Sequence, residues 1–154
     1  MNGAPPRKVY CILSARSLPY AEKCVQSLFA TALEPVDLTL ITDGPDDKRQ
    51  IVESVERLGV KAPHRCVVYS QPEADAIAAS KFAGYENLQQ FRFGHPCWRK
   101  LTDPLLFAAP GEEMIILDPD LYFPNRFTFE PTLASGVVLM WQPPNCLLPD
   151  ETVL

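Results

Sequence analysis

Two aspartates separated by one residue form the strongest chemical feature of this sequence. Asp118 and Asp120 flank Pro119 and directly follow the apolar run Met114–Leu117. Alternate side chains of an extended chain project the same way, so both carboxylates are expected on one side of it. Two such carboxylates can bind one hard divalent cation, which takes its remaining ligands from water and substrate phosphates. The pair predicts a site for Mn²⁺ or Mg²⁺; a solvated turn after a strand is the structural alternative.

The elements that must position this pair alternate between strands and helices. Apolar, strand-length runs predict strands at Lys8–Ser14, Val36–Thr42, Arg65–Tyr69, Met114–Leu117 and Val137–Trp141. One amphipathic helix is predicted over 21–32, and another follows the Asp43-Gly44-Pro45 turn and ends at Gly59. Less regular patterns predict short helical pieces over 71–92, from Pro96, and again from Pro104 with Asp103 as its cap.

Strands that alternate with helices predict an α/β fold, a mostly parallel Rossmann-like sheet with helices on both faces. We expect a single domain over residues 1–154, with a loose N-terminus at 1–7 and a Pro-rich end at 142–154. Ligands of such sheets bind beyond the carboxyl ends of the strands. The rule selects three loops, which contain Ser14, Ala15 and Arg16, then Asp43, and then the aspartate pair.

Composition excludes several classes of function. The net charge of −5 argues against nucleic-acid binding, which requires a basic surface. No apolar run is long enough to predict a transmembrane segment, so we expect a cytoplasmic protein. The five cysteines form no CxxC pair and the chain has only two histidines, which argues against zinc. We expect buried, reduced cysteines.

The order of three segments resembles the GT-A glycosyltransferases, which transfer a sugar from a nucleotide donor. The segments are KVYCILSARS, LTLITDGPDD and HPCWRKLTDPLLFAAPGEEMIILDPDLYF, and the resemblance covers residues 8–125. It implies a nucleotide-diphosphate sugar as substrate, with a UDP-sugar the commonest donor of that family. It also implies Mn²⁺ or Mg²⁺ bound by a D-x-D motif, here Asp118 and Asp120.

The resemblance implies a role for each of the other candidate residues, and each has a structural alternative. It places Ser14, Ala15 and Arg16 in the loop that holds the nucleoside, and Asp43 at the base or ribose. It places Arg99 and Lys100 near the diphosphate or sugar, with His95 a weaker candidate. Structurally, Ser14 to Arg16 could be ordinary loop residues and Asp43 a turn residue. His95, Arg99 and Lys100 could belong to a solvated helix face. Trp98 is expected in the core.

The chain is short for a complete GT-A domain. Only 34 residues follow Asp120 in the 154-residue sequence. In the resembled family the part after the D-x-D strand contacts the acceptor and supplies any catalytic base. The acceptor and the base therefore stay unassigned, and a second subunit that completes the fold is one expectation.

Two other functions compete with sugar transfer. The first is a non-catalytic or fragmentary domain that binds a nucleotide sugar or another subunit. The second is a phosphatase of the haloacid-dehalogenase type, in which Asp118 would be the nucleophile and Asp120 the general acid and base. Dinucleotide oxidoreductases are excluded because no G-x-G-x-x-G follows the first strand.

Overall fold

Four parallel strands form the centre of the part of the chain that the structure describes. The computed structural model describes residues 5–130, so the strand predicted at Val137–Trp141 and the Pro-rich end lie outside the described residues. The strands are β1 (Arg7–Ile12), β2 (Val36–Thr42), β3 (Arg65–Ser70) and β4 (Ile115–Leu117). They pair in the order β3-β2-β1-β4, every pair parallel. The predicted α/β fold is confirmed.

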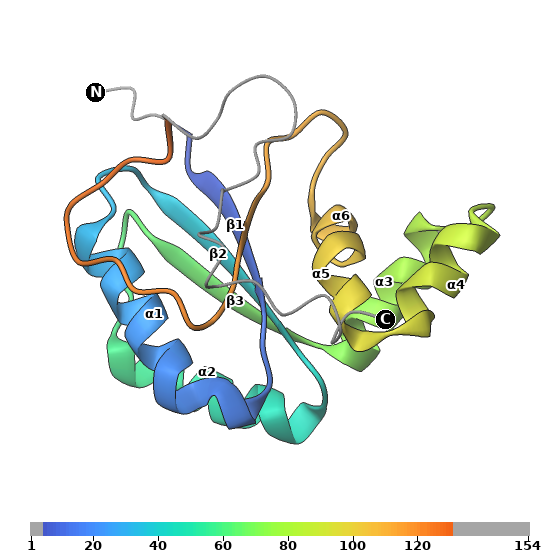
Figure 1. Cartoon of the computed structure of the whole chain (residues 1–154), viewed down its shortest axis with the longest axis horizontal. Coiled ribbons are helices and arrows are strands. Elements are labelled where there is room, and N and C mark those ends of the chain that lie inside the picture. The colour runs from blue at the N-terminus through green and yellow to red at the C-terminus, as the bar shows by residue number, and fades with distance from the viewer. Residues whose placement is uncertain (1–4, 131–154) are drawn as a thin grey trace, which may run out of the picture.

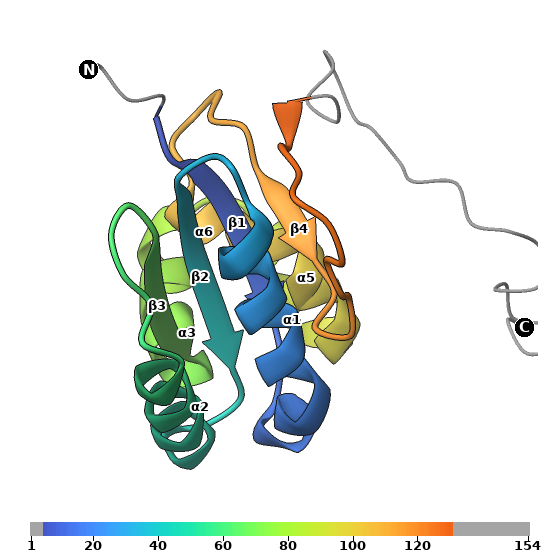
Figure 2. The ribbon, with the colours of Figure 1, turned by 90° about the vertical axis from the view of Figure 1, so that its left-hand side faces the viewer.

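Helices cover both faces of this sheet (Figure 1, Figure 2). The two long helices α1 (Leu18–Thr31) and α2 (Pro45–Leu58) cover one face, in front of the strands in Figure 2. The opposite face carries α3 (Gln71–Lys81) and α6 (Pro104–Phe107), with α4 (Glu86–Gly94) and α5 (Arg99–Thr102) beside them. Two short 3-10 turns are η1 (Ala15–Ser17) and η2 (Pro96–Trp98).

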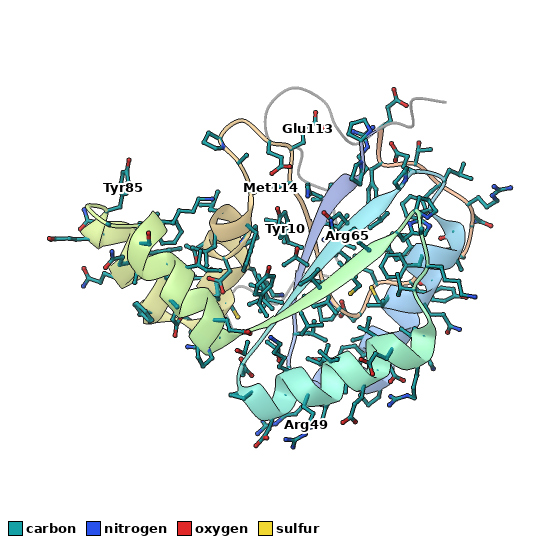
Figure 3. The ribbon with its side chains drawn as sticks, turned by 180° about the vertical axis from the view of Figure 1, so that it is seen from behind. Tyr10, Arg49, Arg65, Tyr85, Glu113 and Met114 are labelled. Atoms are coloured by element: carbon teal, nitrogen blue, oxygen red, sulfur yellow. The ribbon has the colours of Figure 1, made fainter. Side chains whose placement is uncertain are left out.

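Alternation along β1 shows why both faces need a cover. Val9 and Cys11 are buried in the core that includes α1 and α2, whereas Ile12 packs against the smaller core of α3 and α6. Figure 3 shows Tyr10 on this second side, and Arg49 pointing outward from α2. A strand whose two faces are both buried requires apolar side chains on both, which explains the continuous apolar run.

Local signals set the ends of α2 and α3. Pro45 occupies the first turn of α2, Asp46 and Asp47 follow it, and Gly59 ends the helix with φ of 62°. These features match the prediction, because only a residue without Cβ adopts that left-handed conformation at no steric cost. At α3, Ser70 and Glu73 form a reciprocal capping box, in which each side chain bonds to the other's backbone N–H.

Three local expectations were wrong. β1 ends at Ile12, before the predicted strand end at Ser14, which lies in the loop selected from the sequence. Trp98 is 40% exposed and stacks on Phe91 with ring centroids 4.6 Å apart, so it is not a core residue. Asp103 precedes α6 without capping it through its side chain, because its carboxylate is buried in ion pairs with two arginines.

None of the helices within residues 5–130 has the length and hydrophobicity needed to traverse a lipid bilayer.

Candidate functional site

The carboxyl ends of all four strands meet at one edge of the sheet. Parallel pairing with register Ile12–Ile41, Thr42–Ser70 and Cys11–Leu117 keeps these ends together. The segments that leave the strands therefore start at the same edge, which we call the carboxyl edge. Ser14, Asp43, Gln71 and Asp118 lie in those segments. The three loops selected from the sequence share this edge, where open α/β sheets bind ligands.

The aspartate pair lies in a turn. Leu121 N–H points to the carbonyl oxygen of Asp118 at 3.5 Å, and the chain turns over Pro119 and Asp120. The expectation of an extended chain through the pair was wrong, since proline favours the turn here. Both carboxylates are exposed yet close to β1. Burial, together with the nearby charges of Asp118 and Asp120, raises the pKa of the Cys11 thiol to about 12.

Lys100 reaches the aspartate pair from α5. Its ammonium nitrogen Nζ forms an ion pair with Oδ1 of Asp118. The hydrogen bond to this carboxylate raises the pKa of Lys100 above its ordinary value of 10.5. The two residues are 18 positions apart in the sequence and were selected separately. The structure therefore brings one predicted cationic residue onto one predicted metal ligand.

The donor set around the pair fits a divalent cation only when substrate or water completes it. Within residues 5–130 no group of three or more His, Cys, Asp or Glu side chains could hold a metal. Two carboxylates are nevertheless the hard oxygen ligands that Mg²⁺ and Mn²⁺ prefer, and such ions usually keep several other ligands from water and phosphate. The ammonium on Asp118 shows that this carboxylate already holds a cation.

Arg99 joins the ends of two other strands. Its side chain comes from α5 and is only 5% exposed. Nη1 donates to Oε1 of Gln71 at 2.8 Å and lies 3.8 Å from Oδ1 of Asp43. The structure thus brings Arg99 and Asp43 together, although they were selected for different reasons. Gln71 was missed, and its position directly after β3 is the signal that would have found it.

Two buried side-chain atoms at this edge have no hydrogen-bond partner. Among the described residues, the unpaired atoms are Oγ1 of Thr42 and Nη2 of Arg99. Thr42 is the last residue of β2, directly before Asp43. Buried polar groups without partners are rare and costly in folded proteins. Both unpaired buried atoms found in residues 5–130 therefore lie in side chains at the carboxyl edge.

The remaining candidates take no part in the described interactions of the aspartate pair. Ala15 N–H donates to Oδ2 of Asp47 at 2.8 Å, which ties the loop after β1 to the start of α2. Arg16 is exposed and makes no ion pair with another residue in 5–130. His95 uses Nδ1 to accept from Cys97 N–H at 3.1 Å, a local cap of η2. In the described part of the chain, Ala15, Arg16 and His95 make no hydrogen bond or ion pair with the aspartate pair.

The fold is shared with a known glycosyltransferase. No family model matches the sequence, and no curated protein matches it. Among solved structures, the apo form of mouse xyloside xylosyltransferase 1 superposes with a TM-score of 0.52 and 14% sequence identity. The match covers 80% of this chain and 46% of the xylosyltransferase chain. The chain therefore has a glycosyltransferase fold and spans about half the length of that neighbour.

Proposed function

We propose that this chain binds a nucleotide-diphosphate sugar at the carboxyl edge, with a UDP-sugar as the expected donor. The observation that carries the proposal is the clustering of charge there. Lys100 is paired with Asp118, and the buried guanidinium of Arg99 lies beside Asp43. An edge that offers two cations and exposed carboxylates suits a ligand that is anionic in one part and a polyol in another. The glycosyltransferase fold supports the same choice.

Asp118 and Asp120 are the residues we assign to a divalent ion, Mn²⁺ or Mg²⁺. When bound, such an ion neutralises negative charge on the diphosphate and helps to orient the donor. Lys100 would then turn from the carboxylate toward the phosphate oxygens. Asp43 is proposed to accept from the ribose or the base. Ser14, Ala15 and Arg16 are proposed to border the nucleoside.

Arg99 is proposed to donate a hydrogen bond to an oxygen of the nucleotide sugar. Its Nη2 is buried without a partner, and an unsatisfied buried donor costs roughly 1–3 kcal/mol. An acceptor oxygen from the ligand would remove that cost. A donor-binding role therefore explains why the fold retains an unpaired guanidinium nitrogen at this edge.

Transfer of the sugar to an acceptor is the reaction we propose for the protein to which this edge belongs. The acceptor and the catalytic base are not assigned to any described residue. A non-catalytic donor-binding domain, or one completed by a second subunit, remains the alternative, because the chain spans only 46% of its structural neighbour. Binding without turnover in the assay below would select that alternative.

The test is a thermal-shift panel of nucleotide sugars with and without Mn²⁺. A ligand that binds only the folded state, present at a free concentration of about 100 times its Kd, stabilises the folded state by about 2.7 kcal/mol. We expect one donor to raise the melting temperature and to do so more strongly with Mn²⁺. Asp118→Asn with Asp120→Asn should abolish the metal-dependent part, as measured by titration calorimetry.

A matched control separates this result from a simple change of charge. Glu53 and Glu56 are exposed on α2, so Glu53→Gln with Glu56→Gln removes the same charge elsewhere. This double variant should bind the donor as the unaltered protein does. Unchanged donor affinity in the asparagine variant would refute the metal assignment. Release of phosphate from a phosphomonoester, with loss of the activity in Asp118→Asn, would instead favour the phosphatase.

A further inference from the structure

A buried ion network lies behind Arg99 and joins three helices through the residue that precedes a fourth. Asp103 is completely buried, and its Oδ1 accepts from Nε of Arg92 at 2.6 Å while its Oδ2 accepts from Nε of Arg99 at 3.0 Å. Arg92, which is 1% exposed, also pairs through Nη1 with Asp75 at 2.5 Å. The four residues come from α3, α4, α5 and the residue before α6.

The network leaves the guanidinium of Arg99 little freedom. Asp103 holds its Nε and Gln71 holds its Nη1, so two of the three nitrogens are held by separate partners. Because a guanidinium is planar, two fixed nitrogens also determine where the third one, Nη2, lies. Rigid support of this kind is what an accurate binding contact needs.

The charges of the network are shared unequally. Two buried guanidinium groups share the carboxylate of Asp103, and the second carboxylate, Asp75, pairs with Arg92 alone. Arg99 has Asp43 as its only other carboxylate partner in residues 5–130, at 3.8 Å and with that side chain 63% exposed. Arg92 and Arg99 together balance the charges of Asp75 and Asp103, so Arg99 can attract a further oxygen acceptor through the unpaired N–H groups of Nη2 and not through an excess of positive charge.

We propose that Asp103 and Arg92 are positioning residues, which hold Arg99 so that its unpaired Nη2 is presented to an oxygen of the nucleotide sugar. The proposal rests on the proposed function. Asp103 fixes the guanidinium directly. Arg92 fixes Asp103 by binding its other oxygen, and Asp75 anchors Arg92 in turn. Neither Asp103 nor Arg92 needs to contact the ligand.

The test is a double-mutant cycle on donor affinity, measured by calorimetry below the melting temperature. Asp103→Asn and Arg92→Lys should each weaken donor binding roughly threefold to tenfold, in the lower range of coupling within one hydrogen-bond network. In an Arg99→Met background each should change donor affinity less than about twofold, because the residue they position is gone. Equal weakening of nucleotide-sugar binding with Arg99 present and in the Arg99→Met background would overturn the proposal. Unchanged affinity with Arg99 present would overturn it too.

Two further measurements keep loss of stability separate from loss of positioning. Val36→Ala removes buried volume at the amino end of β2, the end of the strand opposite to the carboxyl edge. This variant should lower the melting temperature without changing the affinity for the nucleotide sugar. In the donor-free protein, the Arg99 Nε–H nuclear magnetic resonance signal is identified as the one lost in Arg99→Met. Asp103→Asn should broaden or shift this signal, and an unchanged signal would overturn the proposal.

Failure of the proposed function gives a different pattern. If the unaltered protein binds no nucleotide sugar, both the proposed function and the ligand part of this inference are refuted. The resonance measurement then still decides whether Asp103 orders Arg99. If the donor binds and Asp103→Asn disorders Arg99 without weakening binding, the proposed function stands and the positioning role is refuted.

Discussion

Lys100 puts a positive charge on the carboxylate to which we assign a divalent ion. Its ion pair with Asp118 leaves both side chains partly exposed, 39% and 57%. Exposed pairs of this kind contribute at most about 1 kcal/mol. Under the proposed function, a metal ion would displace the ammonium, and the ammonium would then be available for the diphosphate. Lys100 would therefore oppose binding of the metal alone and favour binding of the nucleotide sugar.

Replacing Lys100 with methionine separates these two effects. We expect Lys100→Met to bind Mn²⁺ up to about fivefold more tightly in the absence of donor, because its competitor is removed. The donor with Mn²⁺ should bind several-fold more weakly, because a phosphate contact is lost. Electron paramagnetic resonance of free Mn²⁺ measures the first and calorimetry the second. Lys61→Met, at an exposed turn before β3, is the control. Weaker Mn²⁺ binding by Lys100→Met would contradict the assignment.

At the scale of elements, the start of α3 determines where Gln71 stands at the carboxyl edge. Glu73 bonds with both oxygens to Lys48 Nζ at 2.7 Å, and its Oε2 accepts from Ser70 N–H at 2.8 Å. The hydrogen bond from Lys48, followed by those from Ser70, lowers the pKa of Glu73 from 4.5 to about 2. These bonds connect α2, β3 and α3 next to the residue that holds Arg99.

The lowered pKa of Glu73 predicts a pH-dependent contribution to stability. The folded state favours the ionised carboxylate, so the stabilisation is complete above 4.5 and is lost as pH falls toward about 2. Since Glu73 is 45% exposed, solvent screens the pair. We expect Glu73→Gln to cost about 1 kcal/mol in urea unfolding near pH 7, a difference that narrows as the pH is lowered toward about 3. Glu53→Gln should show no such narrowing, and a constant difference would contradict the prediction.

At the scale of the whole molecule, the layers of the fold determine which thiols react. Cys11 and Cys24 are buried and Cys66 is half-buried, but Cys97 is exposed on η2, so the expectation of buried cysteines was wrong for Cys97. Burial raises the pKa of Cys11 and Cys66 to about 12 and that of Cys24 to about 11. Only the thiolate is a nucleophile, so a thiol with such a pKa reacts slowly even where a reagent reaches it.

Alkylation with peptide mapping tests this layering. In the native protein near pH 8, iodoacetamide should modify Cys97 at least about tenfold faster than Cys11, Cys24 or Cys66. In denaturant the four rates should converge, because each thiol then titrates near its ordinary value. Modification of native Cys11 as fast as Cys97 would show that the α1–α2 layer does not cover β1.

Sequence alone was enough to predict the order of strands and helices and the place of the D-x-D pair along the chain. These follow from local causes: an apolar run with the period of a strand or helix, Pro45 at a helix start, and Gly59 at a helix end. It also placed Asp43 and Asp118 at one edge, because parallel strands bring their carboxyl ends together. Pro119 showed that a local argument can fail, since the chain turns where an extended path was expected.

Which charged groups meet depends on how distant segments of the chain pack together. Lys100 and Asp118 are 18 positions apart, and Arg99 and Gln71 are 28 apart. The short helices α5 and α6 carry little local signal, and their packing against α3 and α4 is what buries Asp103 between two arginines. The sequence allowed a solvated helix face for Arg99, but the structure buries this side chain in the interior. Contacts between distant segments depend on packing and not on the local sequence pattern.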